Sequence, residues 1–425
     1  MIVLRALLGV AALTAGAWAL SSHRRRFPWR VVSFSLGLQI AIAGLILGTG
    51  SGRSIFEGAA DFFRALIERA APGANLVFGP LANTRAMDGV FGEGAGYIFA
   101  TTASGLLAII FFASLMAVLY HVGAMQLVIW VAARIMKWTL GVSGAEATAM
   151  AANVFAGMTE APLVVRPYIK GMTESELNAL MVGGFATIAG SVLALYMGFV
   201  GPHLAPHLLT ASVMSAPAAF LVAKVMVPET EVSTTAGSIP LVVERSATNL
   251  VDAASTGARE GLELALNVAA MLIAFMALVN LVDWPLAALG EAVGVEGGLS
   301  LARVFGWAFA PVAWLLGVDG WHDSQLVGSL LGTKLAINEF IAYADLSGIL
   351  RGGAAEGGFQ DPRSAAIVTY ALCGFANFAS IGIQIGGISP LAPARRGDLS
   401  RLAPRAMLGG ALASWMTATV AGMFL

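Results

Sequence analysis

Two glutamates stand within stretches of sequence that are otherwise strongly apolar. Glu160 lies within 143–166, and Glu339 lies within 323–345. An ionisable side chain at membrane depth is costly and is usually functional. A carboxylate in such a place could bind a cation, carry a proton or accept hydrogen bonds from a hydroxyl-bearing solute. For either glutamate taken alone, a protonated and hydrogen-bonded core residue is an equal alternative.

Both stretches are predicted to form re-entrant hairpins. In the second stretch, Lys334 and Asn338 stand beside Glu339. The charges divide each stretch into apolar pieces of about 13 residues or fewer, whereas a helix needs about 20 residues to cross the hydrocarbon core. Non-helical backbone at this depth is tolerated where it is buried in protein or lines a cavity. We therefore expect the hairpins to border a cavity.

The composition indicates that lipid is the solvent for most of the chain. Hydrophobic residues make up 58% of the 425 residues and charged residues 12%, with a mean hydropathy of +0.80. Ordinary soluble domains do not have this composition. The net charge of −1 provides no large basic surface, so nucleic acid is not an expected partner. The single cysteine, Cys373, excludes an internal disulfide framework and a cysteine-rich metal site.

Eight stretches are long and apolar enough to cross a membrane as helices. They are 4–22, 31–50, 97–120, 178–200, 206–227, 262–283, 364–390 and 406–424. The segment 51–75 mixes charged with apolar residues and is predicted to be an amphipathic helix on the membrane interface. Arginines at 24–30 and 395–405 predict that these two loops are cytoplasmic and that both termini lie outside. The expected fold class is an all-α polytopic membrane protein with eight transmembrane helices.

The second half of the chain repeats the first. The phrase GFATIAG at 184–190 recurs as GFANFAS at 374–380, each time after an acid-bearing hairpin. The predicted topology gives the two units opposite orientations. Inverted repeats with interrupted helices hold substrate and ion sites near the bilayer midplane. We therefore expect Glu160 and Glu339 to face each other across one site.

This pattern predicts four parts along the chain. They are an N-terminal scaffold part at 1–96, a first repeat at 97–227, a polar cytoplasmic linker at 228–261 and a second repeat at 262–425.

Three strings of residues resemble the concentrative nucleoside transporters. They are GMTEAPL at 157–163 followed by RPY at 166–168, GTKL at 332–335 followed by NEF at 338–340, and CGFANFASIG at 373–382. The strings are long and stand in the correct order, and the similarity extends over nearly the whole chain. The resemblance implies inverted repeats in a homotrimer embedded in membrane lipid, in which each protomer imports nucleosides together with an ion. We expect the inner membrane of a bacterium, because the chain carries no large extensions of the eukaryotic kind.

The resemblance also implies which residues bind the nucleoside. They are Met158, Thr159, Glu160, Val192, Glu339, Phe375, Asn377 and Ser380. The first four would lie around the base, Glu339, Asn377 and Ser380 would bind the ribose hydroxyls, and Phe375 would form an apolar wall. Some relatives have a glutamine at the Met158 position, and a flexible thioether packs against either ring system. The preference for purine or pyrimidine thus stays open.

A sodium site is implied as well. Its ligands would be the side chains of Asn153 and Thr187 and the backbone carbonyls of Ala156 and Ile188. All four supply hard oxygen atoms, and helix breaks expose the carbonyls. Some family members use protons instead, so a titrating Glu160 or Glu339 is the alternative carrier. Sodium is the only cofactor expected, and no residue is assigned a catalytic role.

Three other functions stay open on the sequence. An intramembrane enzyme could use the two glutamates as an acid/base pair and would release an altered substrate. An ion channel would conduct without saturable, substrate-coupled flux. A secondary transporter of another small polar solute would not be inhibited by nucleosides.

Overall fold

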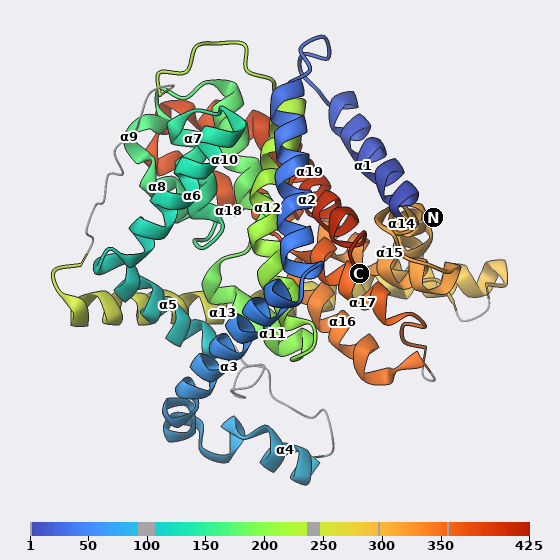
Figure 1. Cartoon of the computed structure of the whole chain (residues 1–425). Helices are drawn as coiled ribbons and strands as arrows, with labels where there is room; N and C mark the ends of the chain where they lie inside the picture. Colours follow the sequence, from blue (N-terminus) through green and yellow to red (C-terminus); the bar gives the residue numbers. More distant parts are fainter. Residues whose placement is uncertain (1, 92–106, 236–246, 296–297, 355–356) are drawn as a thin grey trace.

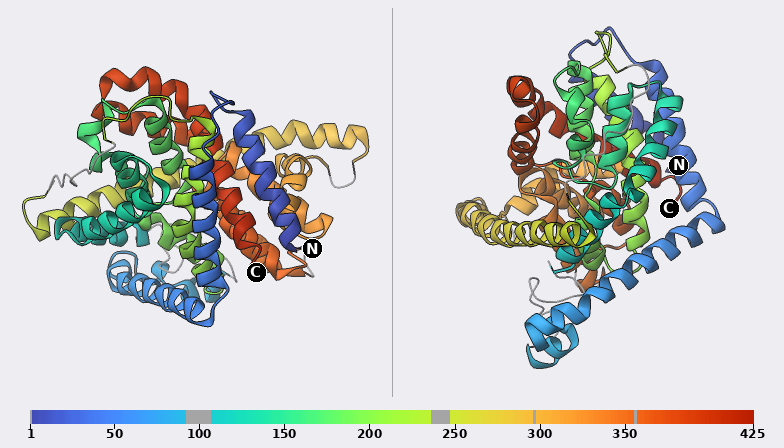
Figure 2. Two further views of the ribbon diagram at one scale, coloured as in Figure 1. Left: turned by 45° about the horizontal axis from the view of Figure 1, so that its top comes forward. Right: turned by 90° about the vertical axis from the view of Figure 1, so that its left-hand side faces the viewer.

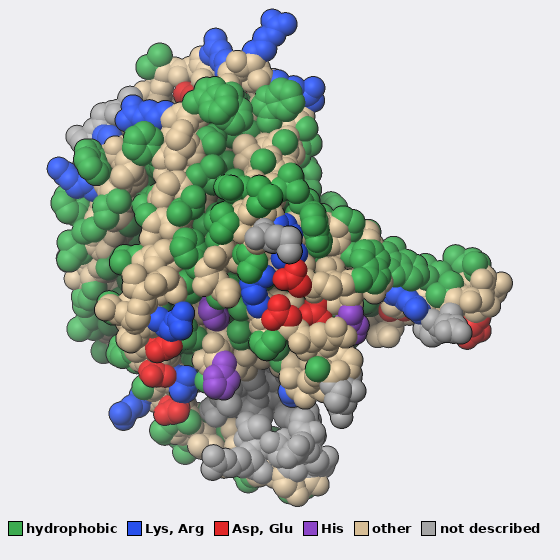
Figure 3. Space-filling view, turned by 45° about the vertical axis from the view of Figure 1, so that its right-hand side comes forward, with side chains coloured by type: hydrophobic (Ala, Val, Ile, Leu, Met, Phe, Trp, Pro, Cys, Tyr) green, Lys and Arg blue, Asp and Glu red, His purple; other side chains and the backbone are tan. Residues whose placement is uncertain are grey.

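The computed structural model describes residues 2–91, 107–235, 247–295, 298–354 and 357–425 (Figure 1). Every secondary-structure element in these ranges is a helix. On the face shown in Figure 3, hydrophobic side chains form a broad belt between mainly Lys and Arg side chains at the upper end and mixed charged and His side chains lower down. The protein is an all-α polytopic membrane protein, as predicted.

A helix lies at each of the eight predicted spans. Five helical segments within the described residues are long and apolar enough to cross a membrane: α1 (Ile2–Ala19), α2 (Trp29–Leu47), α10 with α11 (Glu174–Val200), α12 (Ala205–Met226) and α13 (Leu250–Val293). The other predicted spans correspond to α5 (Leu107–His121), α17 (Pro362–Leu372) with α18 (Phe378–Ile388), and α19 (Arg396–Ala421). Residues 97–106 of the third predicted span lie outside the described part of the chain.

Two of the predicted continuous spans are broken near their middles. The breaks separate α10 (Glu174–Ala186) from α11 (Gly190–Val200) and α17 from α18. Gly374, in the second break, has a φ of +106°, which glycine adopts without steric cost. A Cβ atom on Gly374 would lie 2.6 Å from the carbonyl oxygen of Phe185, at the end of α10. The two breaks therefore pack against each other, and the phrases shared by the repeats mark them.

The two predicted hairpins consist of helical arms separated by short non-helical tips. The first contains α7 (Gly144–Asn153), α8 (Ala161–Val164) and α9 (Arg166–Ile169), and the second contains α15 (Trp321–Ala336) and α16 (Glu339–Gly352). Asn338 caps α16, because its Oδ1 accepts a hydrogen bond from the backbone N–H of Ile341 at 2.9 Å. The second hairpin is longer than the predicted 323–345. Its later charged residues, Asp345 and Arg351, are exposed and do not end α16.

The predicted linker at 228–261 is wrong at its C-terminal end, because α13 begins at Leu250. Asn249 caps this helix by accepting hydrogen bonds from the backbone N–H groups of Val251 and Asp252 at 3.0 and 2.9 Å. The charged residues at the start of α13 are largely exposed and gave the segment a polar composition. The helix has 44 residues and is about 66 Å long at 1.5 Å per residue. It lies across the direction of α2 and α12 (Figure 2).

Two helices that the sequence analysis did not predict precede the hairpins at equivalent places in the two repeats. They are α6 (Ala124–Leu140), between α5 and α7, and α14 (Leu301–Leu316), between α13 and α15. The chain bends by 77° between α5 and α6 and by 108° between α14 and α15. Each helix carries a Trp and an Arg one turn apart in cation–π contact, a composition typical of membrane interfaces.

The remaining elements lie at the edges of the spans. They are α3 (Gly50–Phe78), which covers the predicted interfacial segment 51–75, η1 (Gly79–Ala82), α4 (Thr84–Phe91), η3 (Ser389–Leu391) and η4 (Pro393–Arg395).

The helices differ strongly in burial. In the most apolar part of α12, 94% of the residues are buried, whereas the corresponding share in α13 is 11%. The helix α12 packs against α2, α10 and α19, while α13 packs mainly along α5. Cβ atoms on Gly257 and Gly261 would lie 2.6 and 2.7 Å from the backbone of α5. This small-xxx-small spacing lets the two backbones approach closely.

Candidate functional site

The Glu339 carboxylate connects the two repeats. Its Oε1 accepts a hydrogen bond from the Tyr196 hydroxyl at 2.9 Å, and its Oε2 accepts one from Asn377 Nδ2 at 2.8 Å. Tyr196 belongs to α11 of the first repeat, whereas Asn377 directly precedes α18 of the second. Glu339 is 3% exposed. Two neutral donors thus hold a buried carboxylate at the point where the halves meet.

Asn377 is oriented by the helix that it begins. Its Oδ1 accepts a hydrogen bond from the backbone N–H of Ser380 at 2.8 Å, which caps α18. Because the oxygen is used in the cap, the amide nitrogen points toward Glu339. The structure therefore brings together Glu339, Asn377 and Ser380, the three predicted ribose-binding residues.

Aromatic rings form one side of this cluster. The ring of Tyr196 stacks on that of Tyr343 at a centroid distance of 4.5 Å and meets Phe340 edge-on at 5.1 Å. The Tyr343 hydroxyl donates to the carbonyl of Thr369 at 3.0 Å, so the second tyrosine is fixed by α17. The sequence analysis missed Tyr196, although it lies one turn after the predicted Val192 on α11.

The tip of the first hairpin packs closely on both broken spans. A Cβ atom on Gly184 of α10 would lie 2.8 Å from the Cβ of Met158, and one on Gly387 of α18 would lie 2.5 Å from the Cγ2 of Thr159. Gln384, also on α18 and missed in the sequence analysis, donates to the carbonyl of Met181 at 3.0 Å. Its Oε1 is buried without a partner.

Glu160 has a different environment from Glu339. It is exposed, and its carboxylate accepts a hydrogen bond from the backbone N–H of Gly157 in the same tip. Among the described residues, no hydrogen bond or ion pair joins Glu160 to Glu339. The expectation that the two carboxylates face each other across one site stays a prediction.

The residues predicted to bind sodium are buried where the first hairpin meets the first break. Asn153 is the last residue of α7 and is 0% exposed, and neither atom of its amide has a hydrogen-bond partner. A Cβ atom on Gly183 would lie 2.9 Å from Asn153 Nδ2, so α7 and α10 are close here. Thr187 caps α10 and donates its hydroxyl to the carbonyl of Gly183 at 2.9 Å, which leaves the oxygen lone pairs available.

The tip and the break are also bonded directly. The backbone N–H of Gly190 donates to the carbonyl of Phe155 at 2.9 Å, and the predicted ligands Ala156 and Ile188 are 6% and 1% exposed. A buried amide without a partner is rare and calls for an explanation, and a bound cation that its oxygen coordinates would supply one. The described residues contain no cluster of three or more His, Cys, Asp or Glu side chains that could hold a transition metal.

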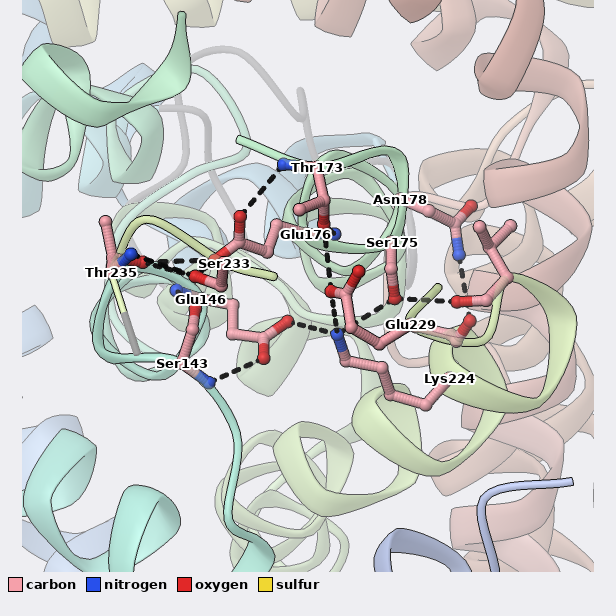
Figure 4. Close-up of polar contacts among 12 residues, drawn as sticks. Ser143, Glu146, Thr173, Ser175, Glu176, Asn178, Lys224, Glu229, Ser233 and Thr235 are labelled. Atoms are coloured by element: carbon pink, nitrogen blue, oxygen red, sulfur yellow. Dashed lines mark hydrogen bonds and ion pairs between the residues drawn. The ribbon is translucent and has the colours of Figure 1, made fainter. Parts of the chain in front are cut away.

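A buried ion pair fixes the far ends of the two helices that end at Asn153 and Thr187 (Figure 4). Lys224, near the end of α12, lies 2.6 Å from Glu146 Oε2 on α7 and donates to Ser175 Oγ on α10 at 2.9 Å. Glu229 lies 3.7 Å from the same ammonium group. We call these four residues the α12 clamp. It joins the starts of α7 and α10, whose opposite ends carry Asn153 and Thr187.

The loop after α12 closes over the clamp. The hydroxyls of Ser233 and Thr235 donate to Glu176 Oε1 at 2.6 and 3.0 Å (Figure 4). Glu176 also accepts from the backbone N–H of Thr173 at 2.9 Å, which completes a capping box at the start of α10. The loop thus adds hydrogen bonds to the start of α10, next to the α12 clamp.

Family models match most of the chain. The model of the Na+ dependent nucleoside transporter C-terminus matches residues 207–422, and that of the N-terminus matches residues 8–81. A model described as nucleoside recognition matches residues 104–203.

Similar proteins cover the chain from end to end. An uncharacterized transporter of Haemophilus influenzae is 44% identical over 100% of this chain and 98% of its own length, and the nucleoside permease NupC of Helicobacter pylori is 37% identical over 98% and 97%. The human sodium/nucleoside cotransporter 1 is 39% identical over 98% of this chain but only 63% of its own length.

Solved structures show the same fold. The structure of CNTnw in an inward-facing substrate-bound state is 42% identical with a TM-score of 0.91, and that of a CNTnw double variant in an outward-facing state has a TM-score of 0.93. Both cover 100% of this chain and 98% of theirs. The family consists of transporters, so the enzyme alternative is set aside. The site geometry, the family models and the relatives together lead to one conclusion: the chain belongs to the Na+-dependent, concentrative nucleoside transporter family.

Proposed function

We propose that this chain is a sodium-coupled symporter that imports nucleosides by alternating access. The observation that carries the proposal is the buried Glu339 carboxylate, held by Tyr196 and Asn377 at the meeting point of the two repeats. A carboxylate accepts two hydroxyl hydrogen bonds at once, and an amide can both donate and accept. Vicinal ribose hydroxyls match these groups in number and in type.

Selectivity for ribose would follow from the same groups. A substrate that lacks a hydroxyl leaves a buried acceptor or donor unpaired, at a cost of about 1–3 kcal/mol for each group. Met158, Thr159, Glu160 and Val192 would border the base, where the thioether gives contact without reading a base edge. Phe375, 8% exposed in the second break, would close the apolar side.

Sodium is the proposed coupling ion. The unpaired Asn153 amide lies beside Thr187 and the tip of the first hairpin, and the available ligands are neutral oxygens. Such a ligand set suits an alkali cation better than a proton, which needs a titrating group. The exposed Glu160 is the group that a proton-coupled mechanism would use.

We include a homotrimer in the proposal. The helix α13 is little buried within the protomer, and both of its ends project beyond the other helices (Figure 1). A helix that packs mainly along α5 has room for further helices from other protomers. In this arrangement, α13 and α5 would stay fixed while the hairpins and broken spans move.

The test is uptake of labelled uridine and adenosine into proteoliposomes under an inward sodium gradient, an inward proton gradient or neither. We expect sodium-driven uptake in the wild type and its loss in Glu339→Gln, which keeps the shape of the side chain but weakens its acceptors. Proton-driven uptake would replace sodium in the proposal. Active, correctly inserted protein that takes up neither nucleoside under any gradient would refute it.

A further inference from the structure

The second repeat contains a buried cation of its own. We propose that the Lys334 ammonium group is a tethered cation, which occupies in the second repeat the place that the coupling ion occupies in the first. The inference rests on the sodium site proposed above. It assigns Lys334 as a positioning residue for the substrate site.

Lys334 binds the free end of a broken helix. It lies on α15 and is 0% exposed. Its Nζ donates to the backbone carbonyls of Ala371 and Cys373 at 2.9 and 3.0 Å and to Ser414 Oγ at 2.9 Å. The last carbonyls of a helix have no partner within it, and α17 ends here. All three acceptors are neutral oxygens, and among the described ion pairs none involves Lys334.

The corresponding region of the first repeat is built from the same parts without the lysine. There the hairpin arm ends with Asn153, whose amide is unpaired, and the broken helix ends at its cap Thr187. The final span contributes a serine in both repeats. Ser212 of α12 donates to the carbonyl of Val154 at 3.0 Å, and Ser414 of α19 accepts from Lys334. In the proposed arrangement, α7 of the first repeat supplies an oxygen ligand for a cation through Asn153. In the second repeat, α15 supplies the cation itself through Lys334.

The tethered charge would keep the second break formed in every state of the transporter. Carbonyls at a helix C-terminus carry partial negative charge, which a cation stabilises. Asn377 lies in the same break as Cys373 and donates to Glu339. Lys334 thus fixes the backbone that positions the ribose-binding groups. Only the first repeat then needs a mobile ion to complete its half of the site.

Burial of a lysine argues against a purely packing role. An ammonium group loses its hydration on burial, and an apolar side chain of similar length fills the same volume without that cost. The position therefore requires the charge. Substituting methionine or alanine for the lysine separates charge from packing.

The experiment compares wild type, Lys334→Ala and Lys334→Met in thermal unfolding in detergent and in sodium-driven uridine uptake. We expect uptake to fall about 10- to 100-fold in both variants, because buried carbonyls are left unpaired. Methylammonium has the charge and size of the removed side-chain end. Present at equal concentration on both sides, it should raise the unfolding temperature of Lys334→Ala and restore part of its uptake, and tetramethylammonium should not.

Lys334→Met is the control for the rescue, because its side chain fills the space and should not respond to methylammonium. If Lys334→Met transports within about twofold of wild type, or if folded Lys334→Ala does not respond to methylammonium, the charge is not needed and the inference is overturned. The failure of sodium coupling is recognised separately. In that case sodium does not raise the unfolding temperature of the wild type, whatever the lysine variants do.

Discussion

The two repeats are built from equivalent helices, but a buried lysine contacts the start of the hairpin arm in the first repeat and lies near the end of the hairpin arm in the second. In the first repeat Lys224 pairs with Glu146, the third residue of α7, at the opposite end of this helix from Asn153. In the second repeat the equivalent third residue of α15, Asp323, accepts instead from the backbone N–H groups of Gln360 and Asp361 at 3.0 and 3.1 Å. The lysine of the second repeat, Lys334, lies beside the break between α17 and α18.

The groups that anchor each hairpin therefore differ from the groups that are proposed to respond to the ion. The first hairpin is anchored to α12 by a charge at its outer end, and the space beside its break is left to neutral ligands. The second hairpin is anchored by backbone N–H groups that donate to the Asp323 carboxylate, and its lysine lies at the break. Under the proposed sodium coupling, this different placement of charge would give one repeat that responds to an ion and one that is already complete.

The largest effect is expected from Lys224→Met, which breaks the charge anchor of the first repeat. Both members of the pair are buried, with side chains 5% and 3% exposed. Removing one partner leaves a buried charge unpaired, and the free energy of unfolding should fall by about 3–5 kcal/mol. The measurement is the unfolding temperature in detergent, followed by tryptophan fluorescence.

The matched control is the double variant Lys224→Met with Glu146→Gln, which removes both charges. Most of the lost stability should return, because replacing a whole buried pair is often nearly neutral. A double variant that is as unstable as the single one would show that the pair is not what anchors α7.

A smaller effect is expected from Tyr196→Phe, which removes the hydrogen bond between the repeats. Hydrogen bonds to charged groups contribute about 1.5–3 kcal/mol. The KM for uridine should rise about 10- to 100-fold, while the sodium concentration that gives half-maximal uptake stays unchanged. Tyr343→Phe is the matched control, since that hydroxyl bonds to the Thr369 carbonyl and not to Glu339. Equal effects of the two variants would contradict a specific role for Tyr196.

The sequence predicted the parts of this comparison that depend on local composition. Glu160 and Glu339 interrupt apolar runs, so both hairpins were predicted. The glycine-containing phrases identified the repeat, but the spans that contain them were predicted to be continuous, and the breaks within them were missed. The start of α13 was missed because its exposed charged residues resemble a linker. Tyr196 and Lys224 were missed for another reason: their partners lie on segments distant in sequence, and only packing brings them together.

Asp323→Asn tests the anchor of the second repeat, in which backbone N–H groups donate to a carboxylate. The asparagine keeps one oxygen acceptor but offers an amino group to the second backbone N–H, so one hydrogen bond is lost. The free energy of unfolding should fall by about 1–2 kcal/mol, less than for Lys224→Met. The two variants are compared by the fall in unfolding temperature under one set of conditions. A larger fall for Asp323→Asn would reverse the assignment of the stronger anchor.

The smallest effect on stability, and the one most specific to the ion, is expected from Asn153→Leu. Without sodium, the buried amide of the wild type has no hydrogen-bond partner, so an apolar side chain of similar volume should leave stability unchanged or raise it by up to about 1 kcal/mol. With sodium, the wild type should be stabilised, because an ion that binds only the folded state raises its unfolding free energy. The variant should lose this sodium-dependent rise in unfolding temperature. If Asn153→Leu is destabilised without sodium and still responds to the ion, the asparagine has a structural role, and the mobile cation of the first repeat must bind elsewhere.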